Sequence, residues 1–380
     1  MLEDFLNKKP LYYDEIDYTR MPRVYEHIKS KLKIPKIIHI VGTNGKGTTG
    51  RFLATALYNI GYSVGHYTSP HILNFNERIW LNNKNISQDN LNQAHEKFIK
   101  ILDEVFVNSL SYFEYTTLLA IYIYQNVDYV VLEAGLGGEY DATSVFTNIL
   151  TVLTPIDIDH EVFLGSTIKD IATTKLNAIQ KSVIVAKQKY YEVYDIADKI
   201  SKSKNTDLFQ TNSLLSDIDK QNIDLIAKRN NLVPYLIDNL STSIAALNYL
   251  NISYKVENFD NSRLFGRLTQ IKENVILDVG HNVLAAKSIV DTLKGKKFTL
   301  IYNSFKDKEY EKILKILKPI ISEVEIIDID NQRVQTYENI EKALNLLEIK
   351  HKRFFEVLDN KEYLVFGSFS VAEAFLRGLK

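Results

Sequence analysis

The chain has 380 residues, of which 45% are hydrophobic and 24% charged, and this length exceeds what one hydrophobic core usually organises. Its 46 basic and 47 acidic side chains give a formal net charge of −1, which offers no general attraction to nucleic acid or anionic lipid. There is no cysteine, so disulfides, thiolate metal sites and a cysteine nucleophile are excluded, and apolar runs such as 118–124 are too short to cross a bilayer. We therefore expect a two-domain, cytoplasmic protein that acts on small molecules.

The first recognisable pattern is a strand, a glycine-rich turn and a helix. Residues 37–41 are apolar and β-branched, the turn from Gly42 to Gly47 breaks the strand, and helical spacing follows from Thr48. Such a turn presents backbone N–H groups and a helix N-terminus to phosphate, while Lys46 can neutralise phosphate oxygens and Thr48 can ligate Mg²⁺. Because Gly47 separates Lys46 from Thr48, this is not a standard Walker sequence. The pattern predicts a P-loop-like site for nucleotide phosphates.

Three further predicted strands end in polar residues. Strand 63–68 ends at Ser69, strand 129–132 runs into Glu133, and strand 149–153 is followed closely by His160. Strands without polar alternation that are separated by helices favour a mostly parallel sheet, in which chemistry gathers at the carboxyl ends. A lone glutamate or histidine is more often structural, but Glu133 and His160 are expected at one edge. Glu133 is thus a candidate ligand for a hard cation.

The sequence from residue 189 onward predicts a peripheral segment followed by a second domain. Residues 189–230 show no clear period and are interpreted as peripheral, a helix is expected near 239–250, and the polar segment 257–262 is a linker. Strands are then expected at 275–278, 298–302, 324–329 and 363–366, alternating with helices that begin near 284, end near 317 and cover 340–347. We predict a P-loop ATP-binding domain over 1–260 and a smaller Rossmann-like α/β domain over 263–380.

The second domain offers a guanidinium and a carboxylate on turns. Arg267 follows a glycine, and Asp278 ends a predicted strand shortly before His281. Arginine can clamp phosphate and aspartate can accept hydrogen bonds from ribose hydroxyls, although ordinary loop residues would look the same.

These residues resemble the Mur ligase superfamily and, within it, the folylpolyglutamate synthase/dihydrofolate synthase enzymes. The matching segments occur in the family's order: 39–49, 67–72, 76–79, 112–114, 132–138, 141–143, 159–160, 164–165, Lys175, 266–268, 277–278, 281–282 and 367–368. The Thr68-Ser69-Pro70-His71 segment is specific to the folate branch, whereas the P-loop form is shared more widely.

The resemblance implies an ATP-dependent ligase with three substrates. A carboxylate of dihydropteroate, tetrahydrofolate or both takes the γ-phosphoryl group of ATP, and L-glutamate then displaces phosphate from the acyl phosphate. Two Mg²⁺ ions are expected, because a carboxylate must approach a triphosphate that repels it. A monomer that binds neither nucleic acid nor membrane is expected.

Site residues follow from the resemblance position by position. ATP is expected at Asn44, Gly45, Lys46, Gly47, Thr48, Asn239, Arg267 and Asp278. One Mg²⁺ is expected at Thr48, Ser69 and Glu133, and the second at His160 and a carbamylated Lys175. Acceptor contacts are expected from Ser69, Pro70, His71, Tyr112, Phe113, Glu114 and Asp141. Lys46, His160, Lys175 and His281 are the candidate catalytic residues, with His281 near the phosphates.

The chain also departs from the family's usual pattern. Glu139 stands where the family has Arg, and Ser144 where it has Asn, so contacts to the substrate carboxylate are expected to differ. Around Lys175 the family's Glu-Lys-Ala-Gly is replaced by Thr-Lys-Leu-Asn, which ends at Asn177.

Three alternatives remain open from the residues. A P-loop protein without ligase chemistry would have no need of Arg267 and Asp278. A UDP-muramyl-type ligase would be expected to carry an extra N-terminal domain and to lack the Thr68 to His71 segment. An inactive homologue would not be expected to retain Lys46, Glu133 and His160 together.

Overall fold

The computed structural model describes residues 1–10 and 17–379, which form two compact units. The first unit comprises Met1–Leu232 and Leu236–Ser262, and the second comprises Val233–Tyr235 and Arg263–Lys380. Each unit has its own sheet and its own hydrophobic core. No helix among the described residues is both long and apolar enough to span a membrane.

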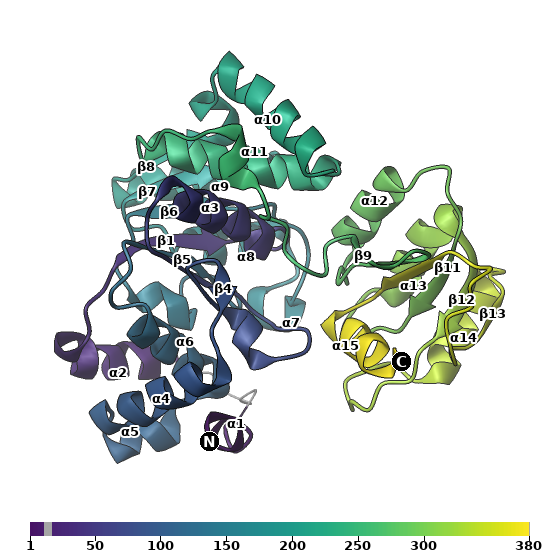
Figure 1. Cartoon of the computed structure of the whole chain (residues 1–380), viewed down its shortest axis with the longest axis horizontal. Helices are drawn as coiled ribbons and strands as arrows, with labels where there is room; N and C mark the ends of the chain where they lie inside the picture. The colour runs from purple at the N-terminus through teal and green to yellow at the C-terminus, as the bar shows by residue number, and fades with distance from the viewer. Residues whose placement is uncertain (11–16, 380) are drawn as a thin grey trace. The chain divides into compact units, whose positions relative to one another are not determined.

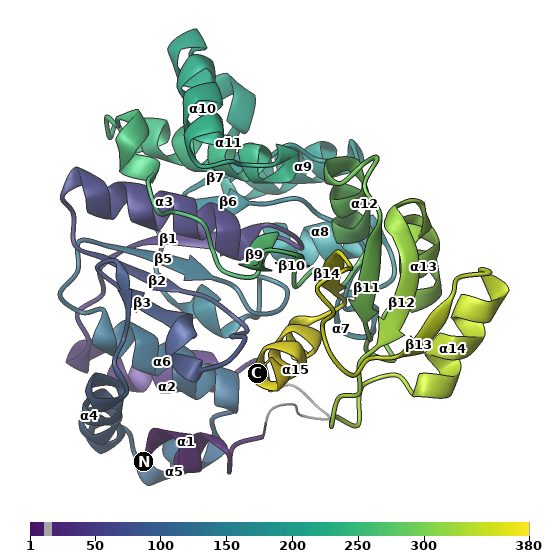
Figure 2. The same cartoon turned by 45° about the vertical axis from the view of Figure 1, so that its right-hand side comes forward.

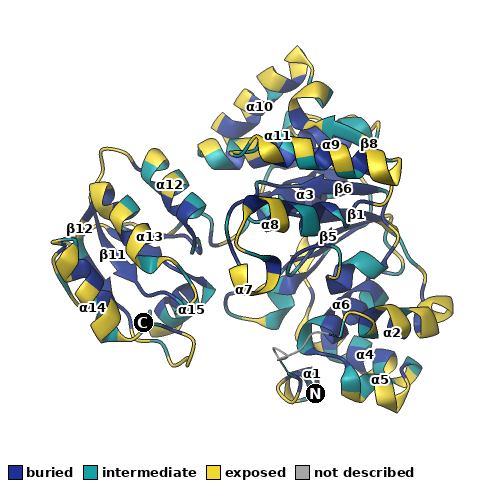
Figure 3. Cartoon of the chain, turned by 180° about the vertical axis from the view of Figure 1, so that it is seen from behind, coloured by how far each residue is buried: buried dark blue, intermediate teal, exposed yellow. Residues whose placement is uncertain are grey.

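The first unit is built on an eight-stranded sheet of order β4-β3-β2-β5-β1-β6-β7-β8 (Figure 1). The strands are β1 Lys36–Val41, β2 Val64–Tyr67, β3 Ile79–Leu81, β4 Lys84–Asn85, β5 Tyr129–Glu133, β6 Leu150–Leu153, β7 Ser182–Val185 and β8 Asp207–Gln210. All neighbours from β2 to β8 are parallel, and β3 and β4 add an antiparallel edge. Central strands are buried throughout because helices cover both faces, as the dark strands of Figure 3 show.

Helices lie on both sides of this sheet. Figures 1 and 2 show α3 (Lys46–Ile60) and α11 (Pro234–Tyr249) on one side, and α6 (Tyr112–Ile123) on the other. The remaining helices of the unit are α1 Leu2–Leu6, α2 Arg20–Ile28, α4 Gln88–Phe98, α5 Glu104–Ser109, α7 Glu161–Leu164, α8 Ile168–Leu176, α9 Glu192–Lys204 and α10 Asp217–Arg229. Short 3₁₀ turns are η1 Lys29–Lys31, η2 Phe75–Arg78, η3 Ile99–Ile101, η4 Ala142–Val145, η5 Thr211–Leu214, η6 Val256–Phe259 and, in the second unit, η7 Lys318–Ile320.

The second unit has a six-stranded sheet of order β13-β12-β11-β14-β10-β9. Its strands are β9 Thr269–Lys272, β10 Val275–Leu277, β11 Phe298–Tyr302, β12 Ile321–Ile326, β13 His351–Arg353 and β14 Tyr363–Phe366. Only β9 runs antiparallel to its neighbour within this sheet of described residues. Its helices are α12 Val283–Thr292, α13 Tyr310–Leu317, α14 Tyr337–Leu346 and α15 Phe369–Gly378.

The predicted fold class, two α/β parts with mostly parallel sheets, is confirmed. Residues 189–230, which were expected to be peripheral, contain α9, β8 and α10, and β8 pairs with β7 as the edge strand of the first sheet. The buried face of α9 consists of Val193, Ala197 and Ser201, which are spaced by four but include two small residues. That composition weakens the hydrophobic period on which the prediction depended.

Candidate active site

The four strands whose ends are polar in the sequence are neighbours in the first sheet. Their order is β2-β5-β1-β6 and all three pairings are parallel. Their carboxyl ends therefore lie at one sheet edge, where Ser69 follows β2, Glu133 ends β5, Gly42 follows β1 and His160 lies beyond β6. The predicted convergence of these strand ends is confirmed.

The glycine-rich turn between β1 and α3 is held tightly at two points. Gly42 has φ +145°, and a Cβ there would lie 2.0 Å from Thr154 Oγ1. Gly45 has φ +83°, and a Cβ there would lie 2.6 Å from Asn239 Oδ1 of α11. Glycine is thus required at both positions, and α3 begins directly afterwards at Lys46. The structure brings Asn239 to the turn, as the resemblance implied.

Backbone hydrogen bonds also join the turn to the segment that follows β6. The N–H groups of Thr43 and Asn44 donate to Pro155 O at 3.0 and 3.1 Å. The first turn of α3 carries N–H groups that have no partner inside the helix, because no preceding turn exists. With Lys46 and Gly47 in this first turn, the junction offers a positive helix end to an anion such as phosphate.

Oxygen ligands of the kind that Mg²⁺ prefers meet beside the turn. Lys46 Nζ lies 3.9 Å from Glu133 Oε1, and Glu133 Oε2 accepts a 3.3 Å hydrogen bond from Ser69 N. Thr48 Oγ1 is buried and has no hydrogen-bond partner among the residues that the structure describes. A buried hydroxyl without a partner is costly, and a bound cation would satisfy it. The residues present therefore fit a divalent cation.

The described residues contain no group of three or more His, Cys, Asp and Glu side chains placed to hold a metal ion. A cation at Thr48 and Glu133 would accordingly need further oxygen ligands from phosphate or water, which is the usual arrangement for Mg²⁺.

Lys175 of α8 reaches the same place from a different element. Its Nζ is buried and donates to Gly42 O at 2.9 Å. Burial, with the charge of Lys46, lowers the pKa of Lys175 to about 7, while Asp159 and Asp141 act in the opposite direction. A surface lysine is what its helical sequence favours taken alone. The structure instead puts a readily deprotonated amine against the turn.

His160 begins the short helix α7 and has a left-handed backbone, with φ 55° and ψ 40°. Its Nε2 lies 3.9 Å from Asp159 Oδ2, and its side chain is 39% exposed, so it remains accessible. Asp159 is mostly buried and acts electrostatically on Lys175, which links His160 to that lysine. Asp159 is absent from the predicted site, although its position directly before His160 at a strand end was a usable signal.

The glycine loop after β5 is organised by Asp141. Its two carboxylate oxygens accept hydrogen bonds from Leu136 N at 2.8 Å and Thr143 N at 2.9 Å, and burial raises its pKa. Phe113 reaches this loop from α6, since a Cβ on Gly135 would lie 2.5 Å from Phe113 Cζ. Phe113 and Asp141, two of the predicted acceptor residues, thus lie at this loop, and the hydrogen bonds of Asp141 set its shape.

A second group of predicted acceptor residues gathers around a buried arginine. Arg78 Nε donates to His71 Nδ1 at 2.8 Å, and His71 is joined to Ser69 through Pro70. The Arg78 guanidinium lies 5.3 Å from the Tyr112 ring centroid. His71 and Tyr112 are therefore brought together, by a residue to which the sequence assigned no role.

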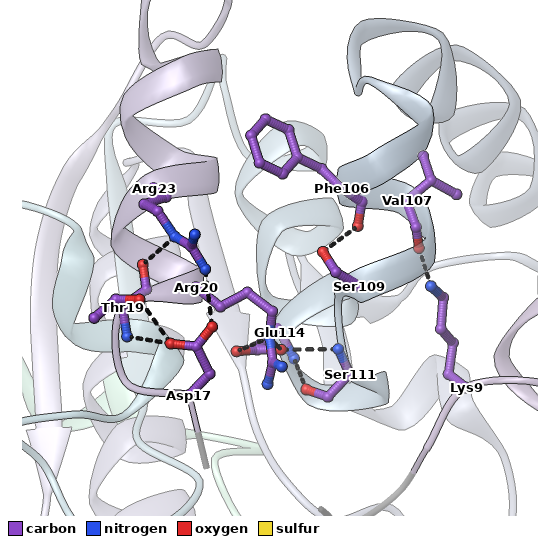
Figure 4. Close-up of polar contacts among 10 residues, drawn as sticks. All are labelled: Lys9, Asp17, Thr19, Arg20, Arg23, Phe106, Val107, Ser109, Ser111 and Glu114. Atoms are coloured by element: carbon purple, nitrogen blue, oxygen red, sulfur yellow. Dashed lines mark hydrogen bonds and ion pairs between the residues drawn. The ribbon is translucent and has the colours of Figure 1, made fainter. Parts of the chain in front are cut away.

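Glu114 is held by partners within the protein. Its carboxylate accepts from Ser111 N at 2.8 Å in the cap of α6 and from Arg20 Nε at 2.9 Å, and both ion-pair side chains are only 11% exposed (Figure 4). Arg20 is 94 residues away in the chain, so no local pattern could reveal this contact. In this arrangement Glu114 fixes the start of α6, next to Tyr112 and Phe113.

In the second unit, Asp278 lies in a closely bonded turn. Its Oδ2 accepts from Tyr235 Oη and Leu268 N, both at 3.0 Å, and its Oδ1 accepts from Gly280 N at 2.8 Å. Tyr235 belongs to the short segment 233–235 that packs with this unit, and no local pattern predicted its role.

Arg267 and His281 share an aromatic neighbour in this unit. The Arg267 guanidinium lies 5.6 Å from the Phe369 ring centroid, and the His281 ring lies 6.5 Å from it. The second-unit residues that the resemblance implied, Arg267, Asp278 and His281, are thus grouped around the turn after β10 and the start of α15.

Known proteins with this architecture are found in both sequence and structure comparisons, although no protein-family model matches the chain. The dihydrofolate synthase/folylpolyglutamate synthase of Haemophilus influenzae is 31% identical, over 97% of this chain and 95% of the relative. The crystal structure of Helicobacter pylori folylpolyglutamate synthetase is 37% identical, with a TM-score of 0.81 over 99% of this chain and 97% of that one.

A second similar structure carries ligands. It is the bifunctional folylpolyglutamate synthase/dihydrofolate synthase of Yersinia pestis complexed with AMPPNP and a Mn ion, with a TM-score of 0.84 over 99% of this chain and 96% of that one, at 23% identity. The identity and coverage of the Haemophilus relative decide the family. The chain belongs to the dihydrofolate synthase/folylpolyglutamate synthase family of ATP-dependent ligases, which form a C–N bond to glutamate.

Proposed function

We propose that this chain accepts both dihydropteroate and a tetrahydrofolate as the carboxylate substrate and joins each to L-glutamate. The Haemophilus relative is named both as a dihydrofolate synthase and as a folylpolyglutamate synthase, and this double name supports two acceptors. The observation that carries the proposal is the convergence of Lys46, Glu133, Ser69 and Lys175 on one sheet edge, because activation of a carboxylate by ATP needs cations beside a phosphate site.

ATP phosphates are proposed to bind residues 44–48 and Asn239 in the domain 1–260. Arg267 is proposed to contact phosphate, Asp278 the ribose, and His281 to lie near the phosphates, all in the domain 263–380. The positive N-terminus of α3 and the contact between Asn239 and the turn support the first part. The grouping of Arg267 and His281 at Phe369 supports the second.

Two Mg²⁺ ions are proposed, the first at Thr48, Ser69 and Glu133 and the second at His160 and Lys175. The unpartnered Thr48 hydroxyl supports the first position. A lysine ammonium would repel Mg²⁺, so the second position requires Lys175 as a carbamate. Its neutral amine would attack CO₂ and lose a proton, which yields an anionic oxygen ligand; the buried amine with a pKa of about 7 supports this modification.

The proposed reaction has two steps. A carboxylate oxygen of the acceptor attacks the γ-phosphorus, the bond to the β–γ bridging oxygen breaks, and ADP leaves with the electron pair. The amine of L-glutamate then attacks the acyl carbonyl, loses a proton, and the tetrahedral intermediate expels phosphate. Lys46 and the N-terminus of α3 would stabilise the phosphate charge in both steps. Bound Mg²⁺ would supply further charge neutralisation at the phosphate oxygens.

The acceptor is proposed to lie against the aromatic residues Tyr112 and Phe113, with Ser69, Pro70, His71 and Asp141 around them. Phe113 lies against the glycine loop and Tyr112 against Arg78, which supports a ring-binding surface there. Glu114 is proposed to act on this surface through its cap and ion pair, which set the start of α6.

The proposal is tested by supplying ATP, Mg²⁺ and L-glutamate with dihydropteroate or tetrahydrofolate in parallel and identifying products by mass. Each acceptor is expected to gain glutamate, with repeated turnover of ATP to ADP only when acceptor and glutamate are both present. Product from one acceptor alone would restrict the function to that activity. ADP formation without any amide product would favour a P-loop ATPase instead.

Three further features stay predictions: a monomer, a cytoplasmic location and no nucleic-acid partner. The near-zero formal charge supports the last of these. Light scattering of the purified chain would test the first.

A further inference from the structure

A side-chain hydrogen bond joins the loop after β5 to the end of α8. Asn177 Nδ2 donates a 2.7 Å hydrogen bond to Glu139 Oε2. Glu139 lies in the glycine loop that follows β5, and Asn177 is the C-cap residue of α8. An arginine at 139 could not accept this bond, and a glycine at 177 could not donate it. The contact therefore requires an acceptor at position 139 and a donor at position 177.

This contact joins a second one between the same two segments. Glu139 N donates to Thr174 O at 2.9 Å. Thr174 lies in the last turn of α8, where carbonyl groups lose their intrahelical partners, so the loop supplies the missing donor. Glu139 thus holds the end of α8 with its backbone and with its side chain.

The segment held in this way contains Lys175. A Cβ on Gly138 would lie 2.7 Å from both Lys175 Cα and Lys175 O, so the loop backbone packs directly on the lysine backbone. At the other end of its side chain, Lys175 Nζ contacts Gly42 O of the phosphate-binding turn. A shift of the loop against α8 would be passed to that amine.

We propose that Glu139 and Asn177 form a latch that positions Lys175 in the active site. They are positioning residues, because neither is assigned a contact with substrate, and the inference rests on the proposed role of Lys175. The feature required by the latch is the hydrogen bond, not the negative charge of Glu139. This distinction makes it testable with substitutions of nearly equal size.

Four variants separate bond from charge. Glu139→Gln keeps an acceptor oxygen and loses the charge, whereas Glu139→Leu loses both. Asn177→Asp sets two carboxylates against each other. The double variant Glu139→Gln with Asn177→Asp restores the bond with its direction reversed and keeps the total charge of the natural pair. Glu192→Gln, at an exposed position of α9, is the matched control.

The latch predicts a loss in kcat that follows the hydrogen bond. Glu139→Leu and Asn177→Asp should lower kcat roughly 10- to 100-fold, since a small misplacement of a reacting group has effects of this size, with KM for ATP nearly unchanged. Glu139→Gln, the double variant and the control should stay near the natural rate. A natural rate in Asn177→Asp, damage by Glu139→Gln equal to that by Glu139→Leu, or no rescue in the double variant would each overturn the proposal.

Hydrogen exchange read by mass spectrometry gives a test that does not depend on activity. Asn177→Asp should speed exchange in the peptide 135–144, and Glu139→Leu should speed it in 172–178, while a peptide from α3 stays unchanged. Exchange that changes only beside each substitution would overturn the latch. If the natural chain forms no amide product, the proposed function fails, while the reciprocal exchange still decides whether the latch exists.

Discussion

The hydroxyl of Thr48 is expected to affect both the stability of the chain and its dependence on Mg²⁺. It is buried without a partner among the described residues, as is Thr55 Oγ1 seven residues later on the same helix. Replacing an unsatisfied buried hydroxyl by a methyl group removes a desolvation cost. Thr48→Val should therefore raise the free energy of unfolding by on the order of 1 kcal/mol and also raise the Mg²⁺ concentration needed for half-maximal activity.

Thr55→Val is the matched control for this prediction. It should stabilise the chain in the same denaturant titration and leave the Mg²⁺ dependence untouched. Equal Mg²⁺ dependence in Thr48→Val and the natural chain would remove Thr48 from the metal site.

Lys46 is proposed to neutralise the charge of the ATP phosphates. Its Nζ lies 3.9 Å from Glu133 Oε1 and donates a 3.4 Å hydrogen bond to Thr43 O, so its removal breaks only long polar contacts. Lys46→Ala should lower kcat at least about 100-fold by removing electrostatic stabilisation of the transition state, while the circular dichroism spectrum is unchanged. The exposed Lys199→Ala serves as the control. Near-normal turnover in Lys46→Ala would contradict the phosphate site.

Lys175 links pH to stability because burial depresses its pKa from 10.5 to about 7. Between these two values the unfolded chain binds more protons at this residue than the folded chain does. The contribution of Lys175 to the free energy of unfolding therefore rises from about pH 7 to pH 10.5. Below about pH 7 the buried amine is protonated and its full destabilising effect applies. Lys175→Met should flatten that rise and stabilise the chain at pH 7, in CO₂-free and metal-free buffer.

The same lysine also gives a test of the carbamate. Lys175→Ala should lose activity and regain part of it with short carboxylates, which would replace the carbamate oxygens. Denaturation curves with the same pH dependence in the natural chain and Lys175→Met would contradict the buried, depressed amine. Full activity of Lys175→Ala without added carboxylate would contradict its role.

At the scale of elements, the glycine loop after β5 and helix α8 fit together without room for a side chain. Gly138→Ala would put a Cβ 2.7 Å from the Lys175 backbone and should cost about 1–3 kcal/mol of stability, with a lower kcat. Gly378→Ala, where nothing lies within 4 Å of the new atom, should leave both quantities nearly unchanged. Denaturant titration and initial rates check this pair, and equal stabilities would contradict the close packing.

Strand positions were predictable because their signals are local. The apolar runs ending at Val41 and Glu133 need no information from elsewhere, and neighbours in a parallel sheet share an edge. Lys175 could be assigned only through a resemblance, because its burial depends on packing against a loop 37 residues earlier. The Arg20 to Glu114 ion pair could not be predicted at all, since it depends on a contact across 94 residues.

At the scale of the whole molecule, the order of motifs along the chain was more informative than any single motif. The glycine turn with Lys46 fits many P-loop proteins, whereas the later segment from Thr68 to His71 points to the folate branch, and the comparisons confirm that family. Helix α9, within residues 189–230, escaped prediction because two of its three buried residues are small and leave a weak hydrophobic period. The edge strand β8 there was missed for a related reason, since its four residues are only partly buried.

Both acceptors are proposed to be activated as acyl phosphates, and isotope transfer measures this directly. Dihydropteroate and tetrahydrofolate, each labelled with ¹⁸O in its carboxylate, are incubated separately with the chain, ATP, Mg²⁺ and L-glutamate, and the mass of the released inorganic phosphate is measured by mass spectrometry. One ¹⁸O atom is expected in each phosphate, because the attacking carboxylate oxygen leaves with it. Phosphate without the label, formed alongside the amide product, would contradict the acyl phosphate route.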